Sequence, residues 1–169
     1  HNGLGSVYDA IGELGNAFEE FKKSLYYDNQ YIHAINNLGV NYAKRGLFNE
    51  SIAEFMKAIK LDTNQAQSHY NLALAYEKQG KATEAIREYN TVIQLDPSNF
   101  NAHYALGMLY QGLGLIDKAI DEFQKIIMLY PNSINVYKNL AFVYMDNKKD
   151  KEMSHYYLKE LLRIDTTQA

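Results

Sequence analysis

The sequence contains no cysteine and no tryptophan, and only 2 of its 169 residues are proline. The absence of cysteine excludes disulfide bonds and thiolate metal sites, and it leaves the redox compartment open. Long apolar stretches are also missing, because the longest run of note, residues 126–130, is far too short to span a bilayer. No signal peptide is visible. We therefore expect a soluble protein with no membrane insertion, and we favour the cytoplasm over an extracytoplasmic compartment.

An excess of positive charge is absent as well. The chain has 17 lysines and arginines against 20 aspartates and glutamates, so its formal net charge is -3, and it has no basic block. Nucleic acids and anionic membrane surfaces attract proteins through clustered lysine and arginine side chains. The composition therefore argues against both kinds of partner.

The most informative feature that is present is an internal period of 34 residues. It is carried by leucines and tyrosines at Leu4, Leu38, Leu72, Leu106 and Leu140, and at Tyr8, Tyr42, Tyr76, Tyr110 and Tyr144. Small residues recur at Gly5, Gly39, Ala73, Gly107 and Ala141, and aromatic residues at Phe21, Phe55, Tyr89, Phe123 and Tyr157. Glycine recurs at Gly12, Gly46, Gly80 and Gly114, and Lys148 breaks this series. One small unit is therefore copied five times along the chain.

Each copy contains two amphipathic segments with helical spacing. Leu72, Ala73 and Tyr76 share one face of a first segment, and Ala85 and Tyr89 share one face of a second. The glycine between the segments can take the left-handed conformation that ends a helix without a Cβ penalty. We predict helices at residues 1–11, 14–27, 32–45, 48–61, 66–79, 82–95, 100–113, 116–129, 134–146 and 150–164.

Residues 68–90 read Ser-His-Tyr-Asn-Leu-Ala-Leu-Ala-Tyr-Glu-Lys-Gln-Gly-Lys-Ala-Thr-Glu-Ala-Ile-Arg-Glu-Tyr-Asn, which resembles the tetratricopeptide-repeat consensus. The resemblance extends over essentially the whole chain. It implies an all-α fold, a right-handed α-solenoid (superhelix) of stacked helix-turn-helix units, with the first helices lining a concave groove and the second helices forming the convex back. We expect a single domain over residues 1–169, with copies at 1–31 (truncated at its start), 32–65, 66–99, 100–133 and 134–167.

The resemblance also implies which side chains face the groove, because fixed positions of each first helix point inward in this family. The partner-binding residues on this basis are His33, Asn36, Asn37, Lys44, Gln67, Tyr70, Asn71, Lys78, Asn101, Tyr104, Met108, Gln111, Lys138 and Asn139. An asparagine side chain offers a peptide group both a donor and an acceptor, and tyrosine adds rigid apolar area with a polar tip. Asn37, Asn71 and Asn139 resemble the asparagine ladder by which some family members hold a peptide, although asparagine there is also the family consensus. The first hypothesis is a non-catalytic module that binds an extended peptide in this groove.

Other functions stay open at this point. The chain can be an assembly scaffold that associates end to end or binds folded partners on its convex face, where Glu54, Lys57, Glu88 and Lys125 alternate. It can also be the adaptor region of a larger enzyme such as a glycosyltransferase, or its groove can be filled by a segment of the protein itself. The carboxylate clamp that grips the acidic tails of heat-shock chaperones is not expected, because its positions carry no cation. Those positions are Asn36, Val40, Asn71, Asn101 and Ala105.

The two ends of the chain suggest a fragment that stacks on something else. In register, the first copy should start three residues before His1, so the chain opens inside a helix. Solenoids need end faces that are compatible with water. At the other end, Tyr156, Leu158 and Leu162 leave an apolar edge on the last predicted helix. We expect self-association or further protein at one or both ends.

Catalysis and metal binding are not expected. His69 and His103 share a column where the family places a bulky aromatic residue, and no metal-binding spacing or carboxylate partner accompanies them. Asp121 with Glu122, like Asp9 with Glu13, is interpreted as a solvated helix surface and not as an acid-base pair. We therefore predict packing histidines, no enzymatic activity, no cofactor and no metal site.

Overall fold

A computed structural model of the chain describes residues 1–168, with the side chains of residues 1–164. These residues form ten helices, and no strand is found among them. The helices are α1 (Asn2–Ala10), α2 (Leu14–Tyr27), α3 (Ile32–Lys44), α4 (Phe48–Leu61), α5 (Ala66–Lys78), α6 (Ala82–Leu95), α7 (Phe100–Gly112), α8 (Ile116–Leu129), α9 (Ile134–Asp146) and α10 (Lys151–Gln168). Helices α1 to α9 begin and end within one residue of the predicted bounds. None of these ten helices is both long and apolar enough to cross a membrane.

The last helix differs from its predicted bounds, since α10 begins at Lys151 and continues to Gln168. In the four earlier copies the turn glycine has a positive φ of 73° to 83°, as at Gly46 and Gly80. The fifth copy has lysine there, and the positive φ, 56°, moves to Lys149. Asp150 then caps α10 by accepting a hydrogen bond of 3.0 Å from the backbone N–H of Met153. The altered turn therefore delays the start of the helix by one residue.

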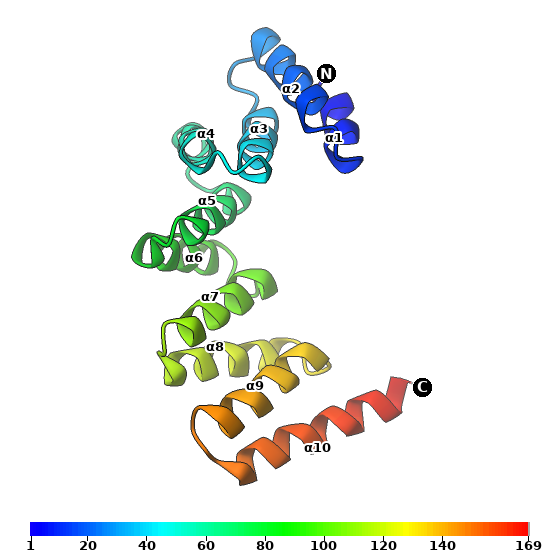
Figure 1. Ribbon diagram of the computed structural model, residues 1–169, viewed down its shortest axis with the longest axis vertical. Helices are drawn as coiled ribbons and strands as arrows, with labels where there is room; N and C mark the ends of the chain where they lie inside the picture. Colours follow the sequence, from blue (N-terminus) through cyan, green and yellow to red (C-terminus); the bar gives the residue numbers. More distant parts are fainter. Residues whose placement is uncertain (169) are drawn as a thin grey trace. The chain divides into compact units, whose positions relative to one another are not determined.

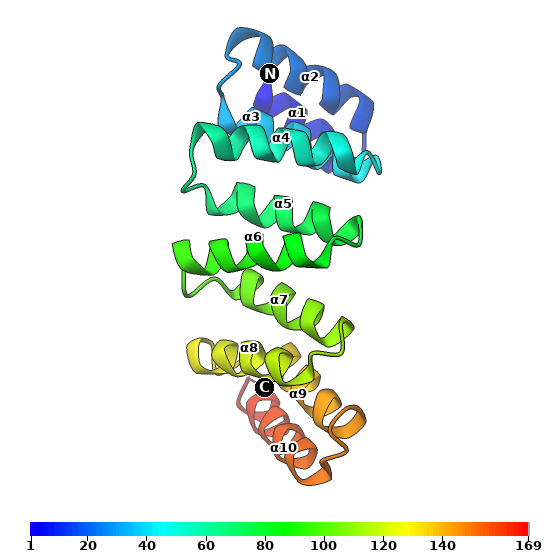
Figure 2. The same cartoon turned by 90° about the vertical axis from the view of Figure 1, so that its left-hand side faces the viewer.

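The chain divides into two compact units, His1–Asp96 and Pro97–Ala169. In the first unit, α1 packs on α2, α3 on α4 and α5 on α6, and contacts between α2 and α3 and between α4 and α5 join the pairs. The helices α1, α3 and α5 also touch in sequence. Figure 1 shows these three along one side of the first unit, with α2, α4 and α6 along the other, and Figure 2 shows the same unit from a second direction.

In the second unit, α7 packs on α8, α8 on α9 and α9 on α10. The contact between α9 and α10 includes ring stacking, since the rings of Tyr144 and Tyr157 have centroids 5.5 Å apart and are tilted by only 19°. The helix-turn-helix unit is therefore the building block of both halves of the chain.

The core of each copy consists of one buried aromatic ring packed against a small residue on the partner helix. Phe55 is fully buried, and a Cβ atom added to Gly39 would lie 2.6 Å from its ring. Glycine is therefore required at that position, because the two helix backbones approach too closely for a side chain. The leucine column is buried too, except that Leu4 is 48% exposed on α1.

Candidate functional site

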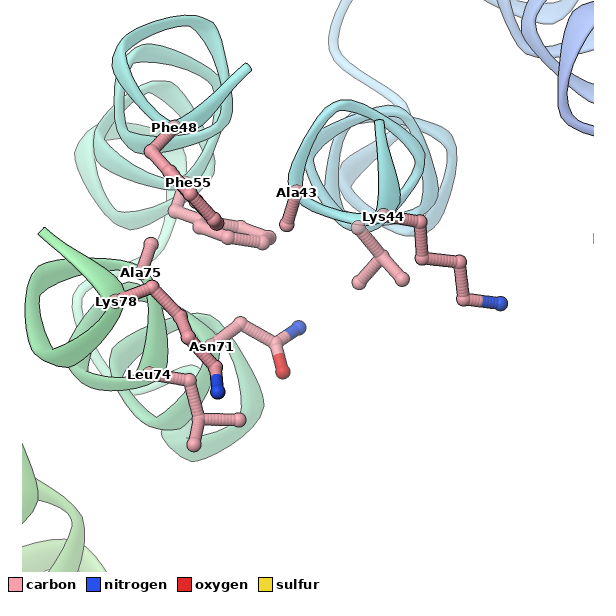
Figure 3. Close-up of a pocket in the computed structure, with 9 residues that line it drawn as sticks. Ala43, Lys44, Phe48, Phe55, Asn71, Leu74, Ala75 and Lys78 are labelled. Carbon is pink, nitrogen blue, oxygen red and sulfur yellow. The ribbon is translucent and has the colours of Figure 1, made fainter. Parts of the chain in front are cut away.

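Two adjoining pockets lie in the first unit, and both are bordered by α3 and α5. The amide pocket has a volume of about 410 Å³ and is lined by Asn2, His33, Asn36, Asn37, Val40, Gln65, Gln67 and Asn71. The apolar pocket has a volume of about 350 Å³ and is lined by Val40, Ala43, Lys44, Phe48, Phe55, Asn71, Leu74, Ala75 and Lys78 (Figure 3). Because Val40 and Asn71 line both, the two pockets form one continuous surface.

Hydrogen bonds between side chains orient the amides of the amide pocket. Asn37 reaches from α3 to α1, where its Nδ2 donates to Asn2 Oδ1 at 2.9 Å. Gln67 Nε2 donates to Asn71 Oδ1 at 2.9 Å along α5. An amide side chain has two N–H donors and an oxygen with two lone pairs, so each of these bonds leaves hydrogen-bonding capacity for a ligand. Asn36 differs, because it is buried and donates to Ser68 Oγ at 2.9 Å, which makes it part of the wall.

The apolar pocket exists because two of its residues are smaller than their counterparts in every other copy. Ala43 corresponds to Asp9, Glu77, Gln111 and Met145. Ala75 corresponds to Val7, Asn41, Leu109 and Val143. In the third copy the equivalent space holds a hydrogen bond of 2.9 Å from the Tyr89 hydroxyl to Glu77 Oε2, whereas the second copy has Phe55 and Ala43. Truncated side chains therefore leave the cavity open.

Two lysines border the apolar pocket, and they differ in their partners. Lys44 Nζ lies 2.5 Å from Asp9 Oδ2, and Figure 3 shows its side chain pointing away from Phe48 and Phe55. Lys78 forms no ion pair with any acid among the described side chains. Lys78 is therefore the available cation at the edge of this pocket, and no acidic residue lines it.

The predicted groove residues of the first unit are gathered in these pockets, with one exception. His33, Asn36, Asn37, Gln67 and Asn71 line the amide pocket, and Lys44, Asn71 and Lys78 line the apolar pocket. Tyr70 lines neither, since its ring packs against Tyr89 with centroids 5.7 Å apart. Burial, and then the charge of Glu77, raise the pKa of the Tyr70 hydroxyl, which therefore stays protonated at neutral pH.

In the second unit, α7 and α9 bring three of the predicted residues together. Asn139 Nδ2 donates to the Tyr104 hydroxyl at 3.1 Å and approaches Met108 Sδ at 3.5 Å. The other predicted residues of this unit are Asn101 and Lys138, which are both exposed, and Gln111, which is half-buried. Met108 is also exposed, so this cluster presents a thioether and an amide to the solvent.

Sequence reasoning missed part of the lining, namely Asn2, Gln65, Ala43, Phe48, Phe55 and Ala75. The family resemblance identifies positions whose side chains point inward. It does not consider side-chain size, so it does not reveal a cavity that short side chains leave open. The signal was nevertheless present, since Ala43 and Ala75 are each the smallest residue of their column.

The prediction that the histidines have no carboxylate partner is wrong. His69 Nδ1 lies 2.7 Å from Glu88 Oε2, and His103 Nδ1 lies 2.6 Å from Glu122 Oε2. In both rings Nε2 lies 3.1 Å from a backbone carbonyl, which can only accept, so Nε2 is the donor there. Both pairs tie the first helix of a copy to its second helix.

The interpretation of Glu88 and Glu122 as surface acids is wrong for the same reason. Each side chain belongs to a residue that is only 7% exposed. Glu122 also accepts a hydrogen bond of 2.7 Å from Lys125 Nζ. The chain itself gives a signal for these pairs, because a glutamate follows the histidine of this column by 19 residues in three copies. The third such pair is His1 with Glu20. Loss of one partner alone would leave the other buried without its hydrogen bond, which would destabilise the packing of the two helices.

The sequence matches profiles of one family along most of its length. A profile described as TPR repeat matches residues 41–80 and 78–114, and profiles described as tetratricopeptide repeat match residues 1–31 and 100–133. The chain belongs to the tetratricopeptide-repeat family. Members of this family are typically non-catalytic helical modules for protein interaction. No curated protein sequence matches the chain.

Solved structures with the same fold include those of MamA and YrrB. A crystal structure of MamA is 28% identical, with a TM-score of 0.86 over 98% of this chain and 96% of that chain. MamA 41-end from Desulfovibrio magneticus RS-1 is 20% identical, with a TM-score of 0.84 over 98% of this chain and 93% of that one. YrrB, titled a TPR protein with an unusual peptide-binding site, is 20% identical, with a TM-score of 0.74 over 96% and 84%. The predicted all-α solenoid class is thereby confirmed.

Proposed function

We propose that the protein is a non-catalytic interaction module that binds an extended peptide on the α3 and α5 side of its first unit. The observation that carries this proposal is the amide pocket, where asparagine and glutamine side chains supply six of the eight lining residues. An extended peptide has unpaired backbone N–H and C=O groups, and each must be satisfied when it leaves water. Side-chain amides satisfy both kinds of group.

The chemistry of both pocket linings supports binding and not catalysis. Neither lining contains an aspartate or glutamate, and the only titratable residues are His33, Lys44 and Lys78. General acid-base catalysis needs a pair of groups with matched proton affinities within reach of one substrate atom. Amides do not transfer protons at neutral pH, so they hold a ligand in place. Membership of a family of interaction modules supports the same conclusion.

The test begins with a degenerate library of end-capped nonapeptides passed over the immobilised protein. Retained peptides are sequenced, and the most enriched one is labelled for fluorescence anisotropy. Asn71→Ala should weaken its binding about tenfold, because an amide shared by both pockets loses its hydrogen bonds. Asn90→Ala is the matched control, since Asn90 is an exposed amide on α6 that donates to the Ile86 carbonyl of its own helix. Equal losses in the two variants, or no retained peptide, would contradict the proposal.

A second candidate function, association through the first helix, is favoured by one observation. Leu4, Val7 and Ile11 are all exposed, although the leucines equivalent to Leu4 in the other copies are buried. Apolar residues that cluster on one exposed helix indicate a surface that another chain covers. The same experiment separates the two functions, because association through α1 does not involve Asn71. Partner binding that survives Asn71→Ala unchanged would favour association.

A further inference from the structure

We infer that the apolar pocket selects the ligand, by accepting one bulky apolar side chain whose neighbour in the peptide carries an aspartate or glutamate carboxylate. This inference rests on the proposed function and adds the chemistry of the peptide to it. Ala43 and Ala75 provide the space, and Lys78 provides the charge. These three residues determine specificity, whereas the amide pocket holds the backbone.

The size and the walls of the pocket define the apolar group. Its volume of about 350 Å³ is near the lower end of the roughly 300–1,000 Å³ that ligand pockets span, so it suits a side chain and not a folded element. Phe48 and Phe55 on α4 form one wall, and Leu74 and Ala75 on α5 form the opposite one (Figure 3). Aromatic and aliphatic walls favour leucine, isoleucine, methionine or phenylalanine, since each gains free energy by leaving water.

The charge at the pocket edge defines the second group. Lys78 has no acidic partner among the described side chains, and Lys44 keeps its ammonium beside Asp9. A lysine that has no carboxylate partner within the protein is complementary to a carboxylate on the ligand. The chain as a whole has a net charge of -3, so the positive potential here is local to this edge.

The continuity of the two pockets fixes how the groups are arranged along the peptide. Val40 and Asn71 line both pockets, so a backbone that lies along the amides passes the opening of the apolar pocket. Figure 3 shows the Asn71 amide pointing from α5 into the space beside α3, where it meets such a backbone. Lys78 follows Asn71 two helical turns later on α5, and side chains at that spacing share a helix face. The carboxylate therefore belongs to a residue close in sequence to the apolar one.

The experiment uses the full chain and the same degenerate library of end-capped nonapeptides, in which side chains are the only source of carboxylates. The wild-type protein should enrich peptides with a bulky apolar residue within a few positions of aspartate or glutamate. Lys78→Gln should remove the preference for an acid and weaken binding of the best acidic peptide about tenfold. Added NaCl should weaken the binding of that peptide to the wild-type protein, and it should weaken its binding to Lys78→Gln much less. Ala43→Met, which introduces the residue of the fifth copy, should remove the preference for a bulky apolar side chain.

Two control variants leave the pocket intact. Lys60→Gln and Ala53→Met make the same changes at exposed positions of α4 that do not line it. Lys78 is exposed, so its replacement does not endanger folding, and circular dichroism verifies the helical content of Ala43→Met. Retained peptides without acids, or an acid preference that persists in Lys78→Gln, would overturn the inference and leave the proposed function standing. Failure to retain any peptide would overturn both.

Discussion

Tyr89 is fully buried between α5 and α6, and its hydroxyl donates to Glu77 Oε2 at 2.9 Å. Burial is the main cause that raises the pKa of this hydroxyl, and the charge and hydrogen bond of Glu77 raise it further. The folded protein therefore holds tyrosine in its neutral form at pH values where an unfolded chain, with a tyrosine pKa of about 10, ionises. The contribution of Tyr89 to the free energy of unfolding therefore depends on pH.

The sign of that term follows from linkage. Because the folded pKa lies above the unfolded one, the contribution is complete below about pH 10 and is lost as the pH rises towards the folded value. Tyr89→Phe should cost about 1 kcal/mol at neutral pH through the lost hydrogen bond. Above about pH 10 its free energy of unfolding should fall less steeply than that of the wild type. Urea unfolding at neutral and alkaline pH measures both effects.

The control for this prediction is Tyr26→Phe, because Tyr26 is 85% exposed on α2. It should leave both the neutral stability and its decline with pH as in the wild type. Equal steepness for Tyr89→Phe and the wild type would show that the buried hydroxyl does not contribute.

At the scale of helix pairs, glycine and alanine in the small-residue column match the aromatic ring opposite. Copies with phenylalanine have glycine, as at Gly107 and Phe123, and copies with tyrosine have alanine, as at Ala73 and Tyr89. A Cβ atom on Gly107 would lie 2.7 Å from the Phe123 ring, which is fully buried and cannot move aside. The ring and the small residue opposite therefore act as a unit.

Gly107→Ala should destabilise the protein by about 1–3 kcal/mol through overpacking, which exceeds the gain in helix propensity of at most about 1 kcal/mol. Gly107→Ala combined with Phe123→Tyr reproduces the residues of the third copy and should recover part of the loss. Urea unfolding of the two single variants and the double variant gives the coupling energy. Gly112→Ala, in the same helix with nothing within 4 Å of its added Cβ, should be neutral or slightly stabilising. A coupling energy of zero would show that the small residue and the ring opposite do not act as a unit.

Helix positions were predictable to one residue for α1 to α9 because the columns that define them are packing positions repeated in every copy. The end of α10 was not, since the helix continues to Gln168 and the predicted bound was residue 164. Its start differs from the prediction by one residue, because Lys148 replaces the turn glycine and Lys149 takes the positive φ instead. The pairs of His69 with Glu88 and His103 with Glu122 were missed as well. Each joins two helices across 19 residues, and a periodicity argument treats the two helices separately.

At the scale of the whole chain, the first unit contains both pockets and every contact described for them. Repeat proteins are stabilised by each unit and by its nearest neighbours, and about three repeats suffice for stability. A fragment of residues 1–96 should therefore fold and bind the selected peptide with nearly the affinity of the full chain. Circular dichroism and fluorescence anisotropy measure these two properties. Loss of helical signal in the fragment, or folding without binding, would contradict this prediction.

The candidate site was predictable from the sequence only in part. Every groove residue predicted in the first unit lines one of the two pockets except Tyr70, because the inward positions follow from the geometry of a repeated helix. Tyr70 lines neither pocket, because its ring packs on Tyr89. The apolar pocket was not predicted, because an empty space depends on how short several side chains are at once.

The two alanines that open this pocket occupy positions that recur in every copy. During evolution, exchanging a pair of residues between copies would close the cavity at one junction and create it at another, while the ring-and-glycine contacts between helices remain as they are. The position of the cavity along such a protein thus depends on two side chains, and it can change while the packing of the helices stays the same.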